Sequence, residues 1–378
     1  MLKRFSSIFA LFLGICLLAS CHHRQSAVSD AKPDSVWVPK YAIGFTIEYY
    51  RNYKCAIVFN PWKKGAVQAR YYIVGNNRTA TPDSCRTIIA PVHSIAATSA
   101  THYAFIAALN ELPTITGVAS QQLVYNQQLI WQYKSGKTVD LGDAFSLNVE
   151  KTLALKPQAV MMSSYNQTDA AAERIVQAGI PVVFNNEWME STPLGRAEWV
   201  KFVAVFYNKE KEANALFVDL ERRYNDLKKL AAATHEIPAV MVGSSFKGTW
   251  YVSGGRGYMG KLLSDARLNY HFAKDTTSGS IPLNFEQALQ YFTDANVWLN
   301  CNAGSLDELM KSDSRYQLFR ACREKQVYSL NNRTNSAGGN DFWEGGVLRP
   351  DLILADYIKV VHPELLPNYS LYYVKKLK

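Results

Sequence analysis

One set of side chains in this sequence has the chemistry needed to recognise a flat ligand. Aromatic rings, hydroxyls and cations occur together in loops or beside short apolar runs: His93, Ser94, Tyr125, Tyr165, Trp188, Lys247, Trp250, Arg256, Phe342 and Trp343. Aromatic rings stack on conjugated surfaces, and arginine or lysine pairs with carboxylates. The set therefore predicts binding of a flat, conjugated or catecholate ligand that bears carboxylates. Plain packing beneath a loop explains any single one of these aromatics equally well.

Motifs for catalysis are missing from the sequence. The segment 253–257, Ser-Gly-Gly-Arg-Gly, is rich in glycine but matches neither G-x-x-x-x-G-K-(S/T) nor G-x-G-x-x-G. There is no G-x-S-x-G and no H-E-x-x-H, and no set of His, Asp and Glu has an obvious metal spacing. We therefore expect a binding protein that is not an enzyme and has no metal or cofactor of its own. A secreted hydrolase would need a nucleophile and a base that no motif locates.

An alternation of strands and helices must position these side chains. Apolar runs typical of buried strands alternate with helical patterns. In the first half the strands are expected at 88–90, 116–118, 159–162 and 182–184, and the helices at 99–108, 148–154 and 168–178. The rhythm returns with strands at 239–242, 297–299 and 326–328 and helices near 258–266, 284–292, 305–310 and 350–361. This alternation predicts parallel sheets, in which ligands meet the loops at the carboxyl ends of the strands.

One long amphipathic segment separates the two α/β regions. From Lys209 to Ala233 there is no Gly or Pro, an apolar stripe recurs at helical spacing, and Asn208 is a suitable N-cap. We therefore predict an α/β fold of two Rossmann-like lobes joined by one long rigid α-helix. A single large doubly wound sheet is the alternative.

An extra N-terminal β-hairpin region should precede the lobes, because 45–50, 55–59 and 69–74 are rich in β-branched and aromatic residues. The expected boundaries are 41–86 for this region, 87–207 for the N-terminal lobe, 208–233 for the helix and 234–378 for the C-terminal lobe.

The N-terminus has the features of an export signal. Lys3 and Arg4 precede an apolar run at 8–18 that is too short to span a bilayer, and Leu-Ala-Ser-Cys at 18–21 resembles a bacterial lipobox. We expect a signal peptide at 1–20, lipidation of Cys21 and a polar, flexible tether at 21–40. A plain signal peptide with an incidental cysteine is the alternative.

Composition and the remaining cysteines are compatible with an exported globular chain. Lysine and arginine number 41 against 32 acidic residues, but the surplus is spread along the chain without a basic run, so we expect no nucleic-acid partner. The simplest disulfide pairing joins Cys55 to Cys85 and Cys301 to Cys322; buried thiols are the alternative.

The two halves of the chain contain a repeated pattern. Leu-Asn-Val-Glu begins a helical segment at 147 that runs into the strand at 159, and Leu-Asn-Phe-Glu begins another at 283 that runs into the strand at 297. The glutamates of the two copies are Glu150 and Glu286. A carboxylate in the first turn of a helix is stabilised by the helix dipole, which would explain each glutamate locally.

With this repeat, the chain resembles the class III, or helical-backbone, substrate-binding proteins of ABC importers for cobalamin, haem and ferric siderophores. The resemblance runs from about 87 to 367 and rests on weak motifs in a consistent order: Asn148-Val149-Glu150 followed by Leu155-Lys156-Pro157-Gln158-Ala159-Val160, Gly179-Ile180-Pro181-Val182, Trp250 to Leu263, and Trp343 to Leu354. Gln158 departs from the family's usual Asp.

The resemblance implies a function and partners. A monomeric lipoprotein, anchored in the bacterial cell envelope and facing the periplasm, would capture an iron-siderophore, haem or corrinoid (cobalamin) between its lobes. It would deliver that ligand to an ABC permease and its ATPase, with Glu150 and Glu286 docking onto permease arginines. The resemblance also makes His93 the best axial-ligand candidate for haem iron or cobalt, although a structural histidine is the simpler explanation. An envelope interaction or structural lipoprotein that reuses the fold is the alternative.

Overall fold

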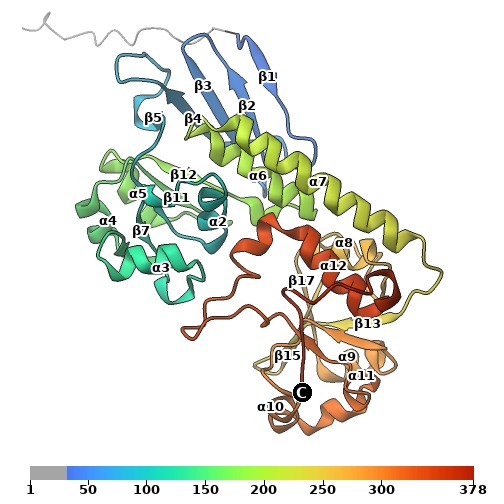
Figure 1. Cartoon of the computed structure of the whole chain (residues 1–378). Helices are drawn as coiled ribbons and strands as arrows, with labels where there is room; N and C mark the ends of the chain where they lie inside the picture. Colours follow the sequence, from blue (N-terminus) through green and yellow to red (C-terminus); the bar gives the residue numbers. More distant parts are fainter. Residues whose placement is uncertain (1–31) are drawn as a thin grey trace, which may run out of the picture. The chain divides into compact units, whose positions relative to one another are not determined.

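The computed structural model describes residues 32–378, and the chain from Pro33 onward forms one compact unit (Figure 1). The expected leader and the expected lipidation site at Cys21 lie outside the described residues. Within residues 32–378, no helix combines the length and the apolar character needed to cross a membrane.

A five-stranded sheet opens the described part of the chain. Its strands are adjacent in chain order: β1 (Ser35–Trp37), β2 (Phe45–Tyr49), β3 (Tyr53–Phe59), β4 (Val67–Val74) and β5 (Thr87–Ile89). The first four are antiparallel and β5 runs parallel to β4. The extra N-terminal β region that the sequence predicts is therefore present, and we call it the N-terminal sheet.

Two expected boundaries change at this sheet. The final part of the expected 21–40 tether is strand β1, because Trp37 packs on Phe45 with ring centroids 5.9 Å apart and the strand pairs with β2. The expected boundary between 86 and 87 falls beside β5, which pairs with β4 in this sheet and not with the first lobe. An apolar run shows that a strand is buried, but it does not show which sheet the strand joins.

The first lobe is a parallel sheet covered by helices. The strand order is β12 (Val182–Phe184), β11 (Ala159–Met162), β6 (Ile95–Ala97), β7 (Ile115–Val118) and β8 (Val139–Asp140). A two-stranded hairpin, β9 (Gly142–Asp143) with β10 (Ser146–Leu147), follows β8. Its helices are α2 (Ala100–Ala108), α3 (Gln127–Lys134), α4 (Val149–Leu155), α5 (Ala170–Gln177) and α6 (Pro193–Val205). The helical patterns at 99–108, 148–154 and 168–178 are confirmed as α2, α4 and α5.

The long helix is confirmed as α7 (Glu210–Ala232), and it packs against α6 and α12 (Pro350–Val361) (Figure 1). Its start differs from the prediction, because Lys209 is the N-cap and makes no side-chain capping bond. Asn208 instead adopts a left-handed turn with φ of 55° and accepts a hydrogen bond from Lys54. Asparagine tolerates this conformation better than most residues, so it serves the turn and not the cap.

The second lobe has a smaller parallel sheet, in the order β16 (Asn269–Tyr270), β13 (Ala239–Val242) and β18 (Val297–Leu299). The strand expected at 326–328 is mostly replaced by a parallel bridge from Val327 to Trp298, followed by β19 (Tyr328–Ser329), which pairs with β20 (Lys375–Lys376). An antiparallel sheet joins β14 (Ser244–Phe246), β15 (Thr249–Ser253) and β17 (Ser280–Leu283). The remaining helices are α8 (Tyr258–Asp265), α9 (Phe285–Phe292), α10 (Leu306–Ser312) and α11 (Arg320–Arg323).

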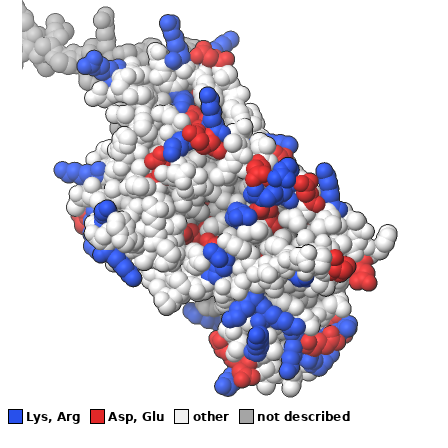
Figure 2. All heavy atoms as spheres, viewed as in Figure 1, with Lys and Arg blue, Asp and Glu red and all other residues white. Residues whose placement is uncertain are grey.

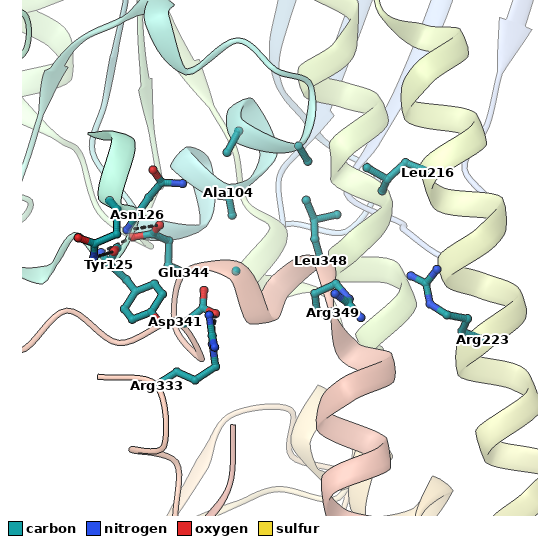
Figure 3. Close-up of a pocket in the computed structure, with 14 residues that line it drawn as sticks. Ala104, Tyr125, Asn126, Leu216, Arg223, Arg333, Asp341, Glu344, Leu348 and Arg349 are labelled. Atoms are coloured by element: carbon teal, nitrogen blue, oxygen red, sulfur yellow. Dashed lines mark hydrogen bonds and ion pairs between the residues drawn. The ribbon is translucent and has the colours of Figure 1, made fainter. Parts of the chain in front are cut away.

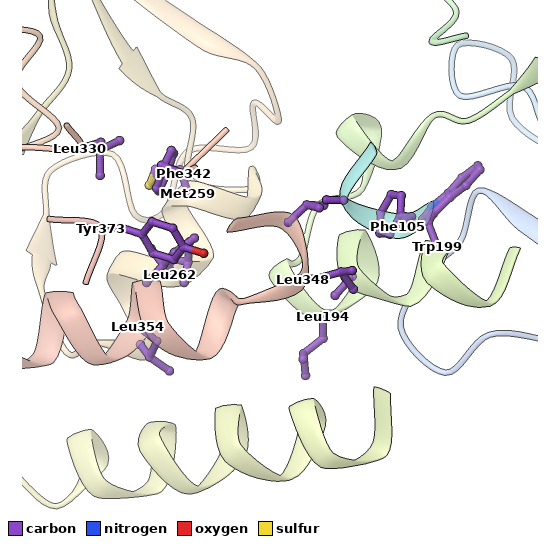
Figure 4. Close-up of a cluster of buried hydrophobic side chains, with 14 of the residues drawn as sticks. Phe105, Leu194, Trp199, Met259, Leu262, Leu330, Phe342, Leu348, Leu354 and Tyr373 are labelled. Carbon is purple, nitrogen blue, oxygen red and sulfur yellow. The ribbon is translucent and has the colours of Figure 1, made fainter. Parts of the chain in front are cut away.

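One hydrophobic core runs through the N-terminal sheet, both lobes and the helices between them. In Figure 4, Phe105 and Trp199 from the first-lobe side and Leu262 and Leu354 from the second lobe belong to the same cluster. A separate cluster fills the space beneath α4 and α5. Because the lobes share a core, large hinge rotations would expose apolar surface, which opposes them.

The disulfide pairing expected as simplest is wrong, since Cys55, Cys85, Cys301 and Cys322 are all free thiols. Cys55 lies buried with Ile57 and Tyr72 on one face of the N-terminal sheet, whereas Cys85 is exposed. The Cys322 Sγ lies 3.7 Å from the sulfur of Met310. Packing, and not cross-linking, therefore accounts for the three buried thiols.

Candidate functional site

The loops at the carboxyl ends of the first-lobe strands enclose a cavity of about 250 Å³. Loops after β6, β7 and β11 and the β9–β10 hairpin line it, and its lining includes Ser120, Phe145 and Tyr165. The Tyr165 side chain is 38% exposed and Phe145 is 80% exposed, so both rings are accessible. Ligands of parallel α/β sheets bind at this edge.

A second cavity, of about 490 Å³, lies between the lobes. Trp188, Met189 and Glu190 from the first lobe face residues of the second lobe at 253, 257–259 and 278–280. Trp62, from the turn between β3 and β4, also lines this cavity. The N-terminal sheet therefore contributes a wall, and we call the two cavities together the cleft.

An aromatic row connects the two cavities. We use this name for Trp62, Trp188, Tyr165 and Phe145. Ring centroids are 6.4 Å apart for Trp62 and Trp188, 5.6 Å for Trp188 and Tyr165, and 5.5 Å for Tyr165 and Phe145. All three pairs are tilted, and none of the four rings is buried. A row of accessible rings offers a long surface on which a flat conjugated molecule can stack.

Buried polar groups fix the loops that carry the row. The Asn186 side-chain oxygen accepts hydrogen bonds from the backbone and hydroxyl of Ser164, which precedes Tyr165. The Asn186 amide nitrogen donates to Gln68 of β4 at 2.8 Å. One side chain thus joins the loop after β11, the loop after β12 and the N-terminal sheet. Such satisfied networks favour a single arrangement.

Two buried carboxylates, one on α6 and one just before it, hold the segment 40–44 between β1 and β2. Glu198 accepts hydrogen bonds from the backbone of Lys40, Tyr41 and Ala42, and Glu190 accepts from Ile43 and Gly44. Burial raises the pKa of the Glu190 carboxyl, and its hydrogen bonds with Trp199 and the backbone oppose that effect. These bonds fix the N-terminal sheet, whose β3–β4 turn carries Trp62, to the first lobe.

A buried cluster lies beneath the cleft. His102 is fully buried on α2, with its Nε2 4.0 Å from Glu187 Oε2, and Arg196 lies 3.5 Å from the other Glu187 oxygen. Burial lowers the pKa of His102 and favours its neutral form. The Arg196 guanidinium stacks over Tyr258 of α8 at 4.3 Å, across the lobe boundary. His102 is therefore a packing group that cannot reach a ligand in the cleft.

The glycine-rich segment 253–257 borders the cleft, which Ser253 and Gly257 line, and its other glycines have a steric reason. A Cβ at Gly254 would meet the carbonyl oxygen of Thr277 at 2.1 Å, and one at Gly255 would meet that of Phe272 at 2.3 Å. Only glycine allows the two backbone segments to approach this closely. Close packing against the segment 272–277 therefore accounts for the glycines at 254 and 255.

The structure brings together some of the side chains predicted from sequence. Tyr165 and Trp188 line the cleft, and Phe342 and Trp343 line a small neighbouring cavity of about 30 Å³ between the lobes. Phe342 is buried, whereas Trp343 is 57% exposed. Tyr125 lines a different and larger cavity, bounded by α2 and α7.

Other predicted side chains lie elsewhere. Trp250 is buried in the second-lobe core, where its indole donates to the Val242 carbonyl. Lys247 is exposed in the turn between β14 and β15. Arg256 is exposed in the glycine-rich segment beside the cleft but is not among the residues that line it.

The strand expected at 88–90 would place His93 and Ser94 at the carboxyl edge of the first-lobe sheet, and this expectation is wrong. Both residues precede β6, so they lie at the amino edge of the first-lobe sheet. Their backbone N–H groups donate to Gln158, which precedes β11 at the same edge. β5 explains this difference. Because β5 pairs within the N-terminal sheet, the loop that follows it is not at the carboxyl end of a first-lobe strand but leads into the first lobe.

Trp62 and Phe145 were missed by the sequence reasoning. Trp62 lies in a polar turn, where the Asn60 side chain accepts hydrogen bonds from the backbone of Trp62 and Lys63. Phe145 lies in the β9–β10 hairpin, after the Asx turn of Asp143. A large aromatic in a polar turn was the available signal.

Within residues 32–378, no group of three or more His, Cys, Asp or Glu side chains is arranged to hold a metal ion.

The repeated glutamates occupy equivalent places in the two lobes. Glu150 is in the first turn of α4 after the N-cap Asn148, and Glu286 is in the first turn of α9 after the N-cap Asn284. Their side chains are 76% and 77% exposed. Each has an arginine neighbour: Arg174 at 2.5 Å from Glu150 and Arg315 at 4.0 Å from Glu286.

Comparisons with known proteins agree with this architecture. An uncharacterized lipoprotein of Methanocaldococcus jannaschii is 26% identical over 305 residues, which cover 78% of this chain and 71% of the relative. A periplasmic haem-binding protein of Pseudomonas aeruginosa superposes with a TM-score of 0.58 at 17% identity, covering 76% of this chain and 98% of that one. The triscatecholate siderophore binding protein FeuA of Bacillus subtilis gives 0.55 at 16% identity, covering 72% and 93%.

The two solved structures, at these identities, establish likeness of fold. The predicted two-lobed, class III architecture is therefore confirmed. Residues 95–334, more than half of the chain, match the periplasmic binding protein family. That stretch begins at β6, so it leaves out the N-terminal sheet, and it ends before α12. The chain belongs to the periplasmic binding protein family, a family of solute-binding proteins.

Proposed function

We propose that this chain is the substrate-binding lipoprotein of an ABC importer and that it captures a ring-shaped metal chelate in the cleft. The aromatic row carries the proposal. It continues from the N-terminal sheet through the loops after β12 and β11 to the β9–β10 hairpin, along both cavities of the cleft. Contacts over such an extended row suit a broad ring system better than a small solute.

The charges of the side chains that line the cleft indicate which class of ligand it binds. The charged residues that line the two cavities of the cleft are carboxylic acids: Asp143, Asp169 and Glu190. Glu190 is occupied by backbone N–H groups, but the two aspartates add negative potential. A ferric tris-catecholate and the propionates of haem are anionic, so they would be repelled. A neutral or cationic corrinoid is therefore the preferred ligand, ahead of haem and siderophores.

Delivery to a permease is supported by the exposed carboxylates of Glu150 and Glu286. Each arginine that pairs with them is itself more than half exposed, and surface ion pairs of this kind contribute about 0–1 kcal/mol. A permease arginine could replace Arg174 or Arg315 at little cost. Two matching carboxylates on two similar lobes suit a partner built from two similar subunits.

Attachment to the envelope completes the proposal. The lipobox-like 18–21 segment and lipidation of Cys21 agree with the lipoprotein name of the Methanocaldococcus jannaschii relative. Cleavage before Cys21 and a periplasm-facing anchor are part of the proposal. The N-terminal sheet and the first lobe share a core with the second lobe, which limits how far the lobes can move apart. Ligand capture then needs a small rocking motion rather than a wide closure.

An absorbance titration tests the ligand assignment. Purified protein is mixed with cyanocobalamin, haem or a ferric tris-catecholate, and bound ligand is measured after gel filtration. We expect a one-to-one corrinoid complex. Trp188→Ala should weaken binding by about 10- to 30-fold, because a central aromatic contact contributes about 1.4–2 kcal/mol. Trp131→Ala is the matched control, since Trp131 is an exposed tryptophan on α3 outside the cleft.

Each outcome of the titration decides between functions. Tighter binding of haem or the siderophore would reject the charge argument while keeping the importer assignment. A lack of binding across the panel would reject small-molecule capture and favour an envelope interaction lipoprotein. Equal losses in Trp188→Ala and Trp131→Ala would show that the aromatic row is not the ligand surface.

A further inference from the structure

A cavity of about 630 Å³ lies apart from the cleft, between α2, α7 and the second-lobe segment 333–349. Figure 2 shows charged side chains of both signs around a hollow beside α7, and Figure 3 shows the residues that line it. The cavity shares none of its lining residues with the two cavities of the cleft. Ligand pockets of proteins are typically about 300–1,000 Å³ in volume.

One side of this α2–α7 cavity is apolar and smooth. Ala104, Ala107 and Ala108 lie at i, i+3 and i+4 on α2, so their methyl groups share one face of that helix. Leu216 of α7 and Leu348 continue the apolar surface. Small side chains at these positions leave room that larger ones would fill.

The other side presents three guanidinium groups, those of Arg223, Arg333 and Arg349, together with the carboxyl groups of Asp341 and Glu344. Arg223 and Arg349 both bond to Asp351, which is buried, and Arg333 bonds to Asp341 at 2.7 Å. The bonds from Arg349 use its Nε and one terminal nitrogen, and the bond from Arg333 to Asp341 uses its Nε. A guanidinium has five N–H donors, so donors are left over on both side chains.

The arginines are also held in place. Arg333 stacks over Tyr372 at 4.3 Å and over Tyr125 at 5.4 Å, which limits the positions of its guanidinium. Arg223 and Arg349 share one carboxylate, Asp351, although Arg223 also pairs with Asp219. Positioned guanidinium groups recognise planar carboxylates through paired hydrogen bonds.

We propose that the α2–α7 cavity is a second ligand site, which takes a small amphipathic carboxylate whose apolar body lies on α2 and whose anion meets the arginines. This site does not depend on the importer assignment or on the ligand of the cleft. A bound molecule would touch the first lobe through α2 and Tyr125, the long helix through Leu216, and the second lobe through Leu348 and Arg349. Occupancy would therefore link the parts that must move when the cleft changes.

Calorimetric titration of the full chain with 2-naphthoate, and with the neutral analogue 2-naphthalenemethanol, tests the site. We expect naphthoate to bind at least tenfold more tightly than the alcohol. Arg349→Gln should reduce the naphthoate affinity about tenfold. Ala108→Phe should reduce it further by filling the apolar side, without removing a charge. Trp188→Ala, which alters the cleft alone, should leave it unchanged.

Two results would overturn the proposal. One is the absence of binding heat with naphthoate, benzoate and octanoate, and the other is equal affinity for naphthoate and the alcohol. Loss of naphthoate binding in Trp188→Ala but not in Ala108→Phe would assign the binding to the cleft. If Arg349→Gln does not fold, Ala108→Phe decides the same question. Naphthoate binding without corrinoid binding would reject the proposed importer ligand and leave this second site standing.

Discussion

Glu344 provides a pH-dependent test of the contact between the lobes. It belongs to the second-lobe segment that follows the Asn340–Trp343 loop, and its carboxylate accepts hydrogen bonds from the backbone of Tyr125 at 2.7 Å and Asn126 at 3.0 Å in the first lobe. The side chain is 3% exposed. Burial raises the pKa of Glu344 to about 7; the nearby Asp341 raises it further, and the two backbone donors oppose the shift.

The raised pKa determines the sign of the pH effect. A carboxyl with a folded-state pKa of about 7 and an unfolded value near 4.5 holds a proton in the folded chain after the unfolded chain has released it. Its contribution to stability is therefore complete below about pH 4.5 and is lost as the pH rises through about 7. A shift of this size corresponds to about 3 kcal/mol, of which about 2.5 kcal/mol is lost between pH 5 and pH 8.

The assay compares wild type with Glu344→Gln, which keeps the shape and one acceptor but cannot ionise. Urea unfolding at pH 5, 6, 7 and 8 gives the free energy of unfolding of both proteins. Other titrating groups are common to the two chains, so the difference isolates Glu344. We expect the wild type to lose about 2.5 kcal/mol relative to the variant from pH 5 to pH 8. A difference that stays constant, or that changes in the opposite direction, would refute the reasoning.

Three further predictions concern other parts of the chain. The double variant Glu150→Ala, Glu286→Ala should reduce ligand uptake by whole cells at least tenfold while leaving ligand affinity in the titration intact; a parallel fall in affinity would contradict the docking role. Glu198→Gln should lower the free energy of unfolding by about 2 kcal/mol, since its new N–H groups face backbone donors; a urea midpoint equal to that of wild type would contradict this. In the folded protein, Ellman's reagent should modify the exposed Cys85 within minutes and spare Cys55, because Cys55 is buried and its pKa is raised to about 11; equal rates would mean that the N-terminal sheet opens readily.

Some features of the candidate site could be predicted from sequence and others could not. Tyr165 and Trp188 directly follow apolar strands, so the rule for parallel sheets places them at the ligand edge. Trp250 has the same aromatic character but is buried by Trp298 and Tyr316, whose ring centroids lie 5.1 and 5.9 Å away. Residue type alone cannot distinguish a ring that meets a ligand from one that fills a core.

The helix α6 shows the same limit for the fold. It is buried on nearly all sides, so its sequence has no polar stripe at helical spacing, and the pattern that revealed α7 is missing. Hydrophobic periodicity detects elements that have one wet face. An element that is enclosed by other elements shows no such periodicity, so only the tertiary structure reveals it.

Local patterns in the sequence were sufficient for the two α/β regions, the long helix between them and the repeated Asn-x-Glu helix starts, because strand and helix periodicity and N-capping depend on neighbouring residues. Only the tertiary structure decided that β5 joins the N-terminal sheet, that His93 therefore lies at the far edge, and that Trp62 faces Trp188 across more than a hundred residues of chain. Contacts between distant segments depend on which surfaces pack together, and that choice is made by the whole core at once.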